Sequence, residues 1–422
     1  MRYLIKNAKI VTPDKVSQRK DILIVNGVIQ QIDRNIEDTK ALVISSKNLH
    51  VAIGFCDVGT FVGEPGLEER ESSESISQSA AKGGYTVLAP FPNLQPVIDS
   101  KSSVRFVKEC YANSHLQVYP IGAVSKGSKG QDIAEILDMH EHGAIAFSDG
   151  NQSIQNTGLL LRALQYAKKI NTPIIQCSEE QALSKDTYMH EGATSTSLGL
   201  AGMPSDAEAI MVKRDIDLAK YAEADICLHN ISSKEAVQSV KDANKKGKFV
   251  YASVPAMNLI HIDEELHDFD TNLKVIPPVR AKKDRKALVK AVNTDRIDFI
   301  ASNHQPVDLE HKDLEFLRSF FGASTLDTVF SSLLTYLAEE ISLSKLIDKL
   351  SYGSRKVLGL AIPKIEVGEV ADLVVFDPSS SWEVTTSTIF SKSKNNPYIG
   401  KTLNGIVHAV FQKKKVVHLT KT

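Results

Sequence analysis

The chain has 422 residues, of which 24% are charged, and its formal net charge is −1 at pH 7. This length is enough for one large hydrophobic core and a smaller companion domain. A net charge so close to zero excludes strong electrostatic attraction to nucleic acid or to an anionic membrane surface. The composition therefore predicts a soluble globular protein that binds neither nucleic acid nor membrane.

The cysteines and the first residues predict the cellular compartment. Cys56, Cys110, Cys177 and Cys227 show no CxxC spacing, so we expect no disulfide framework, and a reducing cytosol fits. The N-terminal sequence MRYLIKNAKIV alternates like a strand and lacks a secretory pattern. No apolar run approaches the length of a membrane span. We therefore expect a cytoplasmic protein.

Both ends of the chain predict short β-strands. In residues 1–50, short apolar segments are separated by turn residues, and the pair Asn26–Gly27 is typical of a hairpin. Residues 361–422 return to strands, with the lysine run at 413–415 forming a further turn. We expect the two terminal segments to combine in one small β-domain.

The central segment, residues 51–360, alternates short apolar strands with longer helical stretches, which predicts a (β/α)8 barrel of the α/β class. Helices are predicted for Pro204–Tyr221, with Ser205 as N-cap, and for Ser324–Glu340. The predicted strands are Ala52–Asp57, Tyr85–Ala89, Gln117–Ala123, Ala144–Ser148, Pro173–Cys177, Asp225–Leu228, Phe249–Val254 and Phe299–Ser302.

Several stretches resemble one enzyme family. VAIGFCDVGTFVGEPG, at 51–66, is similar to the first barrel strand of the cyclic amidohydrolases, above all dihydroorotase, which reads roughly PGxxDxHxHxREPG. AAKGGYTVLAPFPNLQPVID, LGLAGMPSDAEAIMVKRDIDLA, NLKVIPPVRAKKD and the closing segment from 391 also resemble dihydroorotase motifs, in the family's order. The resemblance implies a (β/α)8 barrel over 51–360 with a composite β-sandwich from 1–50 and 361–422.

The family's chemistry uses a metal-bound hydroxide, with zinc held by histidines and an acid, and a catalytic aspartate. The resemblance puts Gly59 and Phe61 at the two histidine positions of the first strand, Cys177 and Asn230 at later histidine positions, and Asn303 at the aspartate. Glycine, phenylalanine and asparagine cannot do the work of these groups. We therefore expect no catalytic residue, no bound metal and no other cofactor.

Other family positions are retained. Asn93, Asp149 and His304 are expected as remnants of the substrate pocket, whereas the position of a carboxylate-binding arginine holds Gly63. If a metal did bind, the candidate ligands would be Asp57, Asp149, Cys177 and His304.

Strand periodicity predicts which side chains face the barrel interior. Because side chains alternate along a strand, Asp57, Gly59 and Phe61 are expected on one inward face. Cys56 and Cys227 are then expected to face the helices, and His229, one residue before the ligand position, is expected out of phase.

Three functions follow from this pattern. The first is a pseudo-dihydroorotase of pyrimidine biosynthesis that acts as a structural or regulatory partner of aspartate transcarbamoylase, as the resemblance implies, within a homo-oligomer. The second is an active dihydroorotase or other amidohydrolase with a rebuilt metal site. The third is a small-molecule sensor that uses the old pocket without chemistry.

Overall fold

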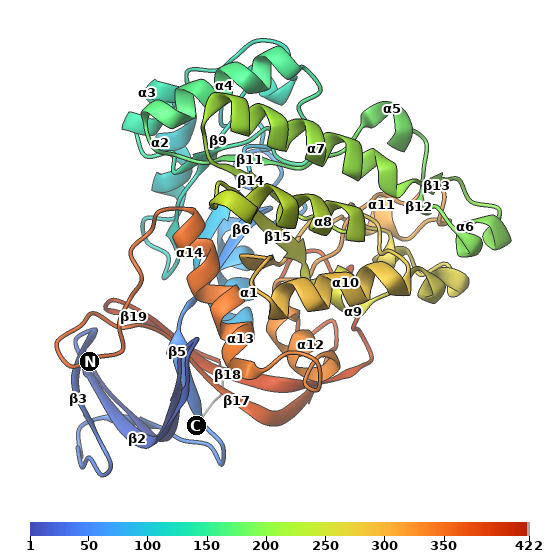
Figure 1. Ribbon diagram of the computed structural model, residues 1–422. Helices are drawn as coiled ribbons and strands as arrows, with labels where there is room; N and C mark the ends of the chain where they lie inside the picture. The colour runs from blue at the N-terminus through green and yellow to red at the C-terminus, as the bar shows by residue number, and fades with distance from the viewer. Residues whose placement is uncertain (420–422) are drawn as a thin grey trace.

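The computed structural model describes residues 1–419 and contains a parallel (β/α)8 barrel (Figure 1). Hydrogen bonds link the barrel strands in the orders β6-β7-β8 and β9-β10-β11-β14-β15-β16. A barrel strand overlaps each of the eight predicted segments, although the bounds differ. The bounds of the barrel strands are β6 Phe55–Thr60, β7 Tyr85–Pro90, β8 Gln117–Val118 with β9 Ile121–Gly122, β10 Ala146–Phe147, β11 Ile174–Gln176, β14 Ile226–Leu228, β15 Val250–Pro255 and β16 Phe299–Ala301.

Asp57 joins the first barrel strand to the last. Its Oδ1 accepts the backbone N–H of Ser302 at 2.8 Å, and its Oδ2 accepts the Ser302 hydroxyl at 2.5 Å. The Thr60 hydroxyl donates to the same carboxylate. Burial raises the pKa of Asp57 from its ordinary value, against these hydrogen bonds. This carboxylate therefore helps to close the barrel between β6 and β16.

Helices cover the outside of the barrel and bury one apolar face each (Figure 1). The longer helices are α1 Ser73–Gly83, α2 Lys101–Cys110, α3 Ile136–Glu141, α4 Thr157–Lys169, α7 Ser205–Ala222, α8 Lys234–Ala243, α10 Lys282–Asn293 and α12 Val329–Tyr336. The shorter elements are α5 Gln181–Ser184, β12 Met189–His190, α6 Ala193–Leu198, β13 Gly202–Met203, α9 Ala256–Ile260, α11 Leu309–Lys312, α13 Leu343–Ile347 and α14 Gly353–Val357. No helix within residues 1–419 is both long and apolar enough to span a membrane.

Two helix predictions were wrong in their bounds. The N-cap of α7 is Pro204, in an extended conformation, so Ser205 is the first helical residue and makes no capping bond. Only Val329–Tyr336 of the predicted helix Ser324–Glu340 is helical, and it forms α12. Thr325 instead holds its segment against the barrel, since its hydroxyl donates to the carbonyl of Ser302 at 2.8 Å.

Strands from both ends of the chain form the composite β-domain beneath the barrel (Figure 1). They hydrogen-bond in the order β19-β18-β17-β5-β1-β2-β3, with β4 beside β1. The antiparallel pairing of β5 with β17 joins the N-terminal and C-terminal parts. The bounds are β1 Arg2–Val11, β2 Val16–Val25, β3 Val28–Asp33, β4 Leu42–Ile44, β5 His50–Ile53, β17 Asp372–Glu383, β18 Thr402–Gln412 and β19 Lys415–His418.

The predicted strand Ala52–Asp57 is divided between these two sheets. Ala52 and Ile53 belong to β5, and the barrel strand β6 begins at Phe55. Gly54 lies between them, where a Cβ atom would lie only 2.1 Å from the Thr86 hydroxyl oxygen. The close approach of the two sheets at this point therefore requires glycine.

The predicted orientation of the first strand was also wrong. Cys56, Val58 and Cys227 pack together inside the barrel, so Asp57 faces the opposite side of β6. The β6–β7 register shifts between Val58 and Thr60, and Gly59 has a φ of +80°. This bulge changes the phase of the strand, so alternation counted along the sequence fails across Gly59.

Candidate active-site pocket

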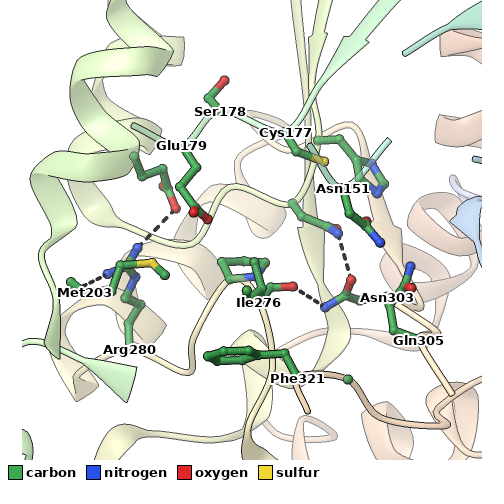
Figure 2. Close-up of a pocket in the computed structure, with 15 residues that line it drawn as sticks. Asn151, Cys177, Ser178, Glu179, Met203, Ile276, Arg280, Asn303, Gln305 and Phe321 are labelled. Carbon is green, nitrogen blue, oxygen red and sulfur yellow. Dashed lines mark hydrogen bonds and ion pairs between the residues drawn. The ribbon is translucent and has the colours of Figure 1, made fainter. Parts of the chain in front are cut away.

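A pocket of about 150 Å³ lies at the carboxyl ends of the barrel strands (Figure 2). This end of a (β/α)8 barrel carries the active site in enzymes with this fold. We call this pocket the inner pocket and define it by Cys177, Glu179, His229, Asn230, Arg280 and Asn303. Cys177, His229 and Asn303 each follow shortly after a barrel strand, which explains why distant parts of the sequence meet here.

His229 fills the space beside Gly59. A Cβ atom on Gly59 would lie 2.7 Å from His229 Nε2 and 2.8 Å from a ring carbon of Phe91. The imidazole is 2% exposed and packs edge-on against Phe91, with ring centroids 5.1 Å apart. The expectation that His229 lies out of phase was wrong, because its side chain reaches the barrel mouth and lines the pocket.

The surroundings of His229 keep its ring neutral. Ser253 Oγ lies 2.9 Å from His229 Nδ1 and also accepts the backbone N–H of Asn230 at 2.8 Å. Burial lowers the pKa of His229 to about 3, so the imidazole is neutral near pH 7. A neutral imidazole carries one N–H donor and one acceptor nitrogen.

The two asparagines in the inner pocket form a directed chain of hydrogen bonds (Figure 2). Asn303 Nδ2 donates to the carbonyl of Ile276 at 3.0 Å, and Asn230 Nδ2 donates to Asn303 Oδ1 at 3.1 Å. A backbone carbonyl can only accept, so both amide orientations are set. Asn303, which the resemblance places at the family's catalytic aspartate, therefore uses its oxygen as an acceptor for Asn230 and carries no basic carboxylate.

Two of the retained residues bond outside the inner pocket. Asp149 accepts the backbone N–H of Ser125 at 2.8 Å and its hydroxyl at 2.5 Å, and burial raises the pKa of this carboxyl. His304 is fully buried, and its Nε2 lies 3.3 Å from Glu71. Its Nδ1 accepts the backbone N–H of Thr325 at 3.1 Å. Asp149 and His304 thus hold loops in place.

Asn93 and Phe61 also lie outside the inner pocket. Asn93 donates to the carbonyl of Asp149 at 3.1 Å and accepts the backbone N–H of Asn151 at 3.1 Å, so it links two loops. Phe61 is 7% exposed, and the Arg70 guanidinium carbon lies 4.2 Å from its ring centroid. His229 therefore occupies the space beside Gly59, while Phe61 lines an adjoining cavity.

Acidic and basic residues of the inner pocket were not found from the sequence. Arg280 donates to the carbonyl of Met203 at 3.1 Å and lies 3.6 Å from Glu208, which accepts the hydroxyl of Ser233 at 2.8 Å (Figure 2). Burial raises the pKa of Glu179 nearby. Arg280 and Glu208 stand in the segments NLKVIPPVR and PSDAE that carried the resemblance, which was the available signal.

The residues at the strand ends do not fit a zinc ion. Within residues 1–419, no three His, Cys, Asp or Glu side chains lie together so that they could hold a metal. Zinc sites use three or four nitrogen, sulfur or oxygen ligands. Cys177 is the one thiol at the pocket, and burial raises its pKa to about 12, which disfavours the thiolate a metal would need. Asp57, Asp149 and His304 bond elsewhere, as described above.

The fold is similar to that of solved hydantoinases and dihydropyrimidinases. L-hydantoinase (dihydropyrimidinase) from Arthrobacter aurescens matches with a TM-score of 0.86 and 22% identity, over 99% of this chain and 96% of that one. The dihydropyrimidinase of Brevibacillus agri NCHU1002 matches with a TM-score of 0.82 and 22% identity, over 99% and 95%. At this identity the likeness concerns the fold alone.

The sequence comparisons identify the family. A family model described as dihydro-orotase-like matches residues 50–236. The dihydroorotase of Thermoanaerobacter sp. (strain X514) is 36% identical over 410 residues, covering 96% of this chain and 95% of the relative. That of Caldicellulosiruptor saccharolyticus is 36% identical over 421 residues, covering 98% of each. The chain therefore belongs to the dihydroorotase family.

Proposed function

We propose that this chain is a non-catalytic dihydroorotase homologue that acts in pyrimidine biosynthesis as a structural or regulatory partner of aspartate transcarbamoylase, within a homo-oligomer. The observation that carries the first part is the loss of ligand donors at the barrel mouth. Gly59 leaves no side chain for a ligand, and the neutral His229 occupies the adjoining space. Ring opening by this family's chemistry requires a metal-bound hydroxide, and residues 1–419 assemble no set of donors for the metal.

The intact scaffold supports the second part of the proposal. The chain has a barrel and a terminal sheet, and Asp57, Asp149 and His304 are used in bonds that hold loops and strands together. A protein that retains its architecture while its reactive positions change retains surfaces on which a partner can assemble. Aspartate transcarbamoylase is named on the family resemblance, because it catalyses the step before dihydroorotase.

An active dihydroorotase with a rebuilt metal site is the main alternative. It would need three or four ligands near the inner pocket, and Cys177 is the only one of the four candidate ligands that lines it. Burial raises the pKa of this thiol to about 12, so it is protonated near pH 7. The geometry therefore favours the non-catalytic function.

Two measurements test the proposal. The first is the turnover of dihydroorotate by the full chain with zinc present, for which we expect no ring opening above the background of a zinc-only control. The second mixes the chain with aspartate transcarbamoylase from the same source and follows the mass of the assembly by light scattering. A larger assembly, or changed transcarbamoylase kinetics, is expected. Robust turnover of dihydroorotate would refute the first part. An unchanged mass for each protein in the mixture, together with unchanged transcarbamoylase kinetics, would refute the second.

A further inference from the structure

A second cavity, of about 530 Å³, adjoins the inner pocket. We call it the outer cavity and define it by Phe61, Arg70, Tyr188, Lys274, Arg318 and Phe321. It shares Asn151, Gln305 and Phe321 with the inner pocket. Among the described residues that line it, three are cationic and none is Asp or Glu. The two cavities therefore differ in charge, because Glu179 and Glu208 line the inner one together with Arg280.

Arg70 is held rigidly at the wall of the outer cavity. Its Nε and Nη2 donate to the carbonyl of Pro306 at 2.8 and 2.6 Å, and its planar group stacks on Phe61. No carboxylate within residues 1–419 lies within 4.0 Å of this guanidinium. Arginine has five N–H donors, and two are used here, so three remain for a ligand.

Burial lowers the pKa of Arg70, which is the sign of a cation that lacks compensation. Asp308 and Glu69 oppose this effect more weakly from outside the cavity wall. Asp308 is engaged with the Nδ1 of His311 at 2.7 Å. A partly buried guanidinium with no ion-pair partner is costly in a folded protein unless an anion joins it.

Lys274 adds a second positive charge, although burial lowers the pKa of this ammonium group to about 8. Its Nζ donates to the backbone carbonyls of Phe316 and Ser319 at 2.6 and 2.7 Å and lies 4.9 Å from the ring centroid of Phe321. Carbonyl oxygens satisfy the ammonium hydrogens without neutralising the charge. Arg318, 78% exposed in its side chain, adds a third cation at the rim beside Glu315, 3.9 Å away. Positive charge at a concave surface concentrates anions.

We propose that the outer cavity binds a small organic anion, in which a carboxylate or phosphate pairs with Arg70 and the attached ring packs among the aromatic side chains. A planar guanidinium binds both anions through paired hydrogen bonds. The arginine position implied by the family resemblance holds Gly63, where a Cβ atom would lie 2.0 Å from the carbonyl oxygen of Glu71. Arg70 comes from the following loop and supplies a guanidinium that position 63 cannot.

This inference rests on the proposed function, because a non-catalytic chain that binds this anion would sense it without hydrolysing it. The binding proposal can fail while the proposed function stands. The test measures binding to the full chain by calorimetry and by thermal shift, with two matched pairs of probes. Dihydroorotate and dihydrouracil share a ring and differ by a carboxylate, whereas uridine monophosphate and uridine differ by a phosphate. The first pair tests a carboxylate source and the second a phosphate source. Ring opening is followed in the same samples, which reports separately on catalysis.

We expect at least one anion to bind and its neutral counterpart to bind about tenfold or more weakly, which corresponds to one charge-assisted hydrogen-bond pair. Arg70→Met should weaken anion binding by a similar factor, and Arg70→Lys should weaken it less, because the charge remains. Arg105→Met, on the exposed face of α2, is the matched control and should bind as the unmodified chain does. Binding should also weaken as salt rises.

Three results would overturn the proposal: no binding of either anion, equal binding of the neutral counterparts, or anion binding unchanged in both Arg70 variants. The Lys variant guards against a folding defect in the Met variant, and circular dichroism of each variant checks the fold. An absence of transcarbamoylase binding would leave these outcomes unchanged, so the two proposals are distinguishable.

Discussion

The packing of His229 against Gly59 makes a strong prediction about Gly59→Ala. A residue other than glycine at a φ of +80° costs about 1–2 kcal/mol. The new methyl group would also lie 2.7 Å from His229 Nε2 and 2.8 Å from Phe91, and overpacking of this kind costs about 1–3 kcal/mol. The free energy of unfolding should therefore fall by about 2–5 kcal/mol, as measured by urea denaturation.

A double-mutant cycle separates the contact from the backbone strain. His229→Ala alone removes a buried ring and should cost about 2–5 kcal/mol. In the double variant the collision with Nε2 is gone, so the combined loss should be smaller than the sum by at least about 1 kcal/mol. Gly130→Ala is the control, because Gly130 has a φ of +67° and open space within 4 Å of its Cβ, and it should show the strain alone. Additive losses within about 0.5 kcal/mol would refute the claim that His229 fills this space.

Three further predictions concern buried charges, each measured by urea unfolding. Asp57→Asn should cost about 1–3 kcal/mol, since an amide group cannot accept all the donors from Ser302 and Thr60. Asp372→Asn should cost about 3–5 kcal/mol, because the Arg355 guanidinium, 3.0 Å away and 1% exposed, would remain without its carboxylate; a loss under about 1 kcal/mol would contradict this. Burial lowers the pKa of Lys312 to about 7. Between pH 7 and about 10.4 the unfolded chain holds a proton that the folded chain has released, so stability should rise with pH over this range. Lys312→Met should lose that component of the pH dependence, and identical pH profiles would show the reasoning to be wrong.

The barrel could be predicted from the sequence because its signals are local. Eight short apolar segments separated by helical stretches identify the fold, and the eight strands lie where these segments occur. The division of the first predicted strand at Gly54 could not be predicted in this way. It depends on the approach of Thr86, which lies in a different strand and is close only in the folded chain.

The sequence predicted which residues lie at the site, but it did not predict which way their side chains point. The family positions correctly identify Gly59, Cys177 and Asn303 as residues at the barrel mouth. Counting alternate residues along the strand nevertheless places Cys56 on the wrong face. The bulge at Gly59 shifts the alternation, and the residue types do not reveal this backbone conformation. The sequence also did not predict that His229 fills the space beside Gly59. This packing depends on Gly59, on another strand, having no side chain.

Arg70 shows a different limit of sequence reasoning. It lies in the charged run LEER, where a solvent-exposed side chain is the ordinary expectation. Its contact with Phe61 and its bonds to Pro306, 236 residues away in the chain, turn it into the wall of a cavity. Long-range contacts of this kind are fixed by the tertiary structure.

The most direct test of the central claim is the metal content of the full chain purified with zinc in the medium and without chelators. We expect well below one zinc ion per chain by elemental analysis, and no gain in thermal stability when zinc is added, because the donors at the strand ends are too few. One tightly held zinc ion per chain, lost on substitution of Cys177 or Asp149, would contradict the account.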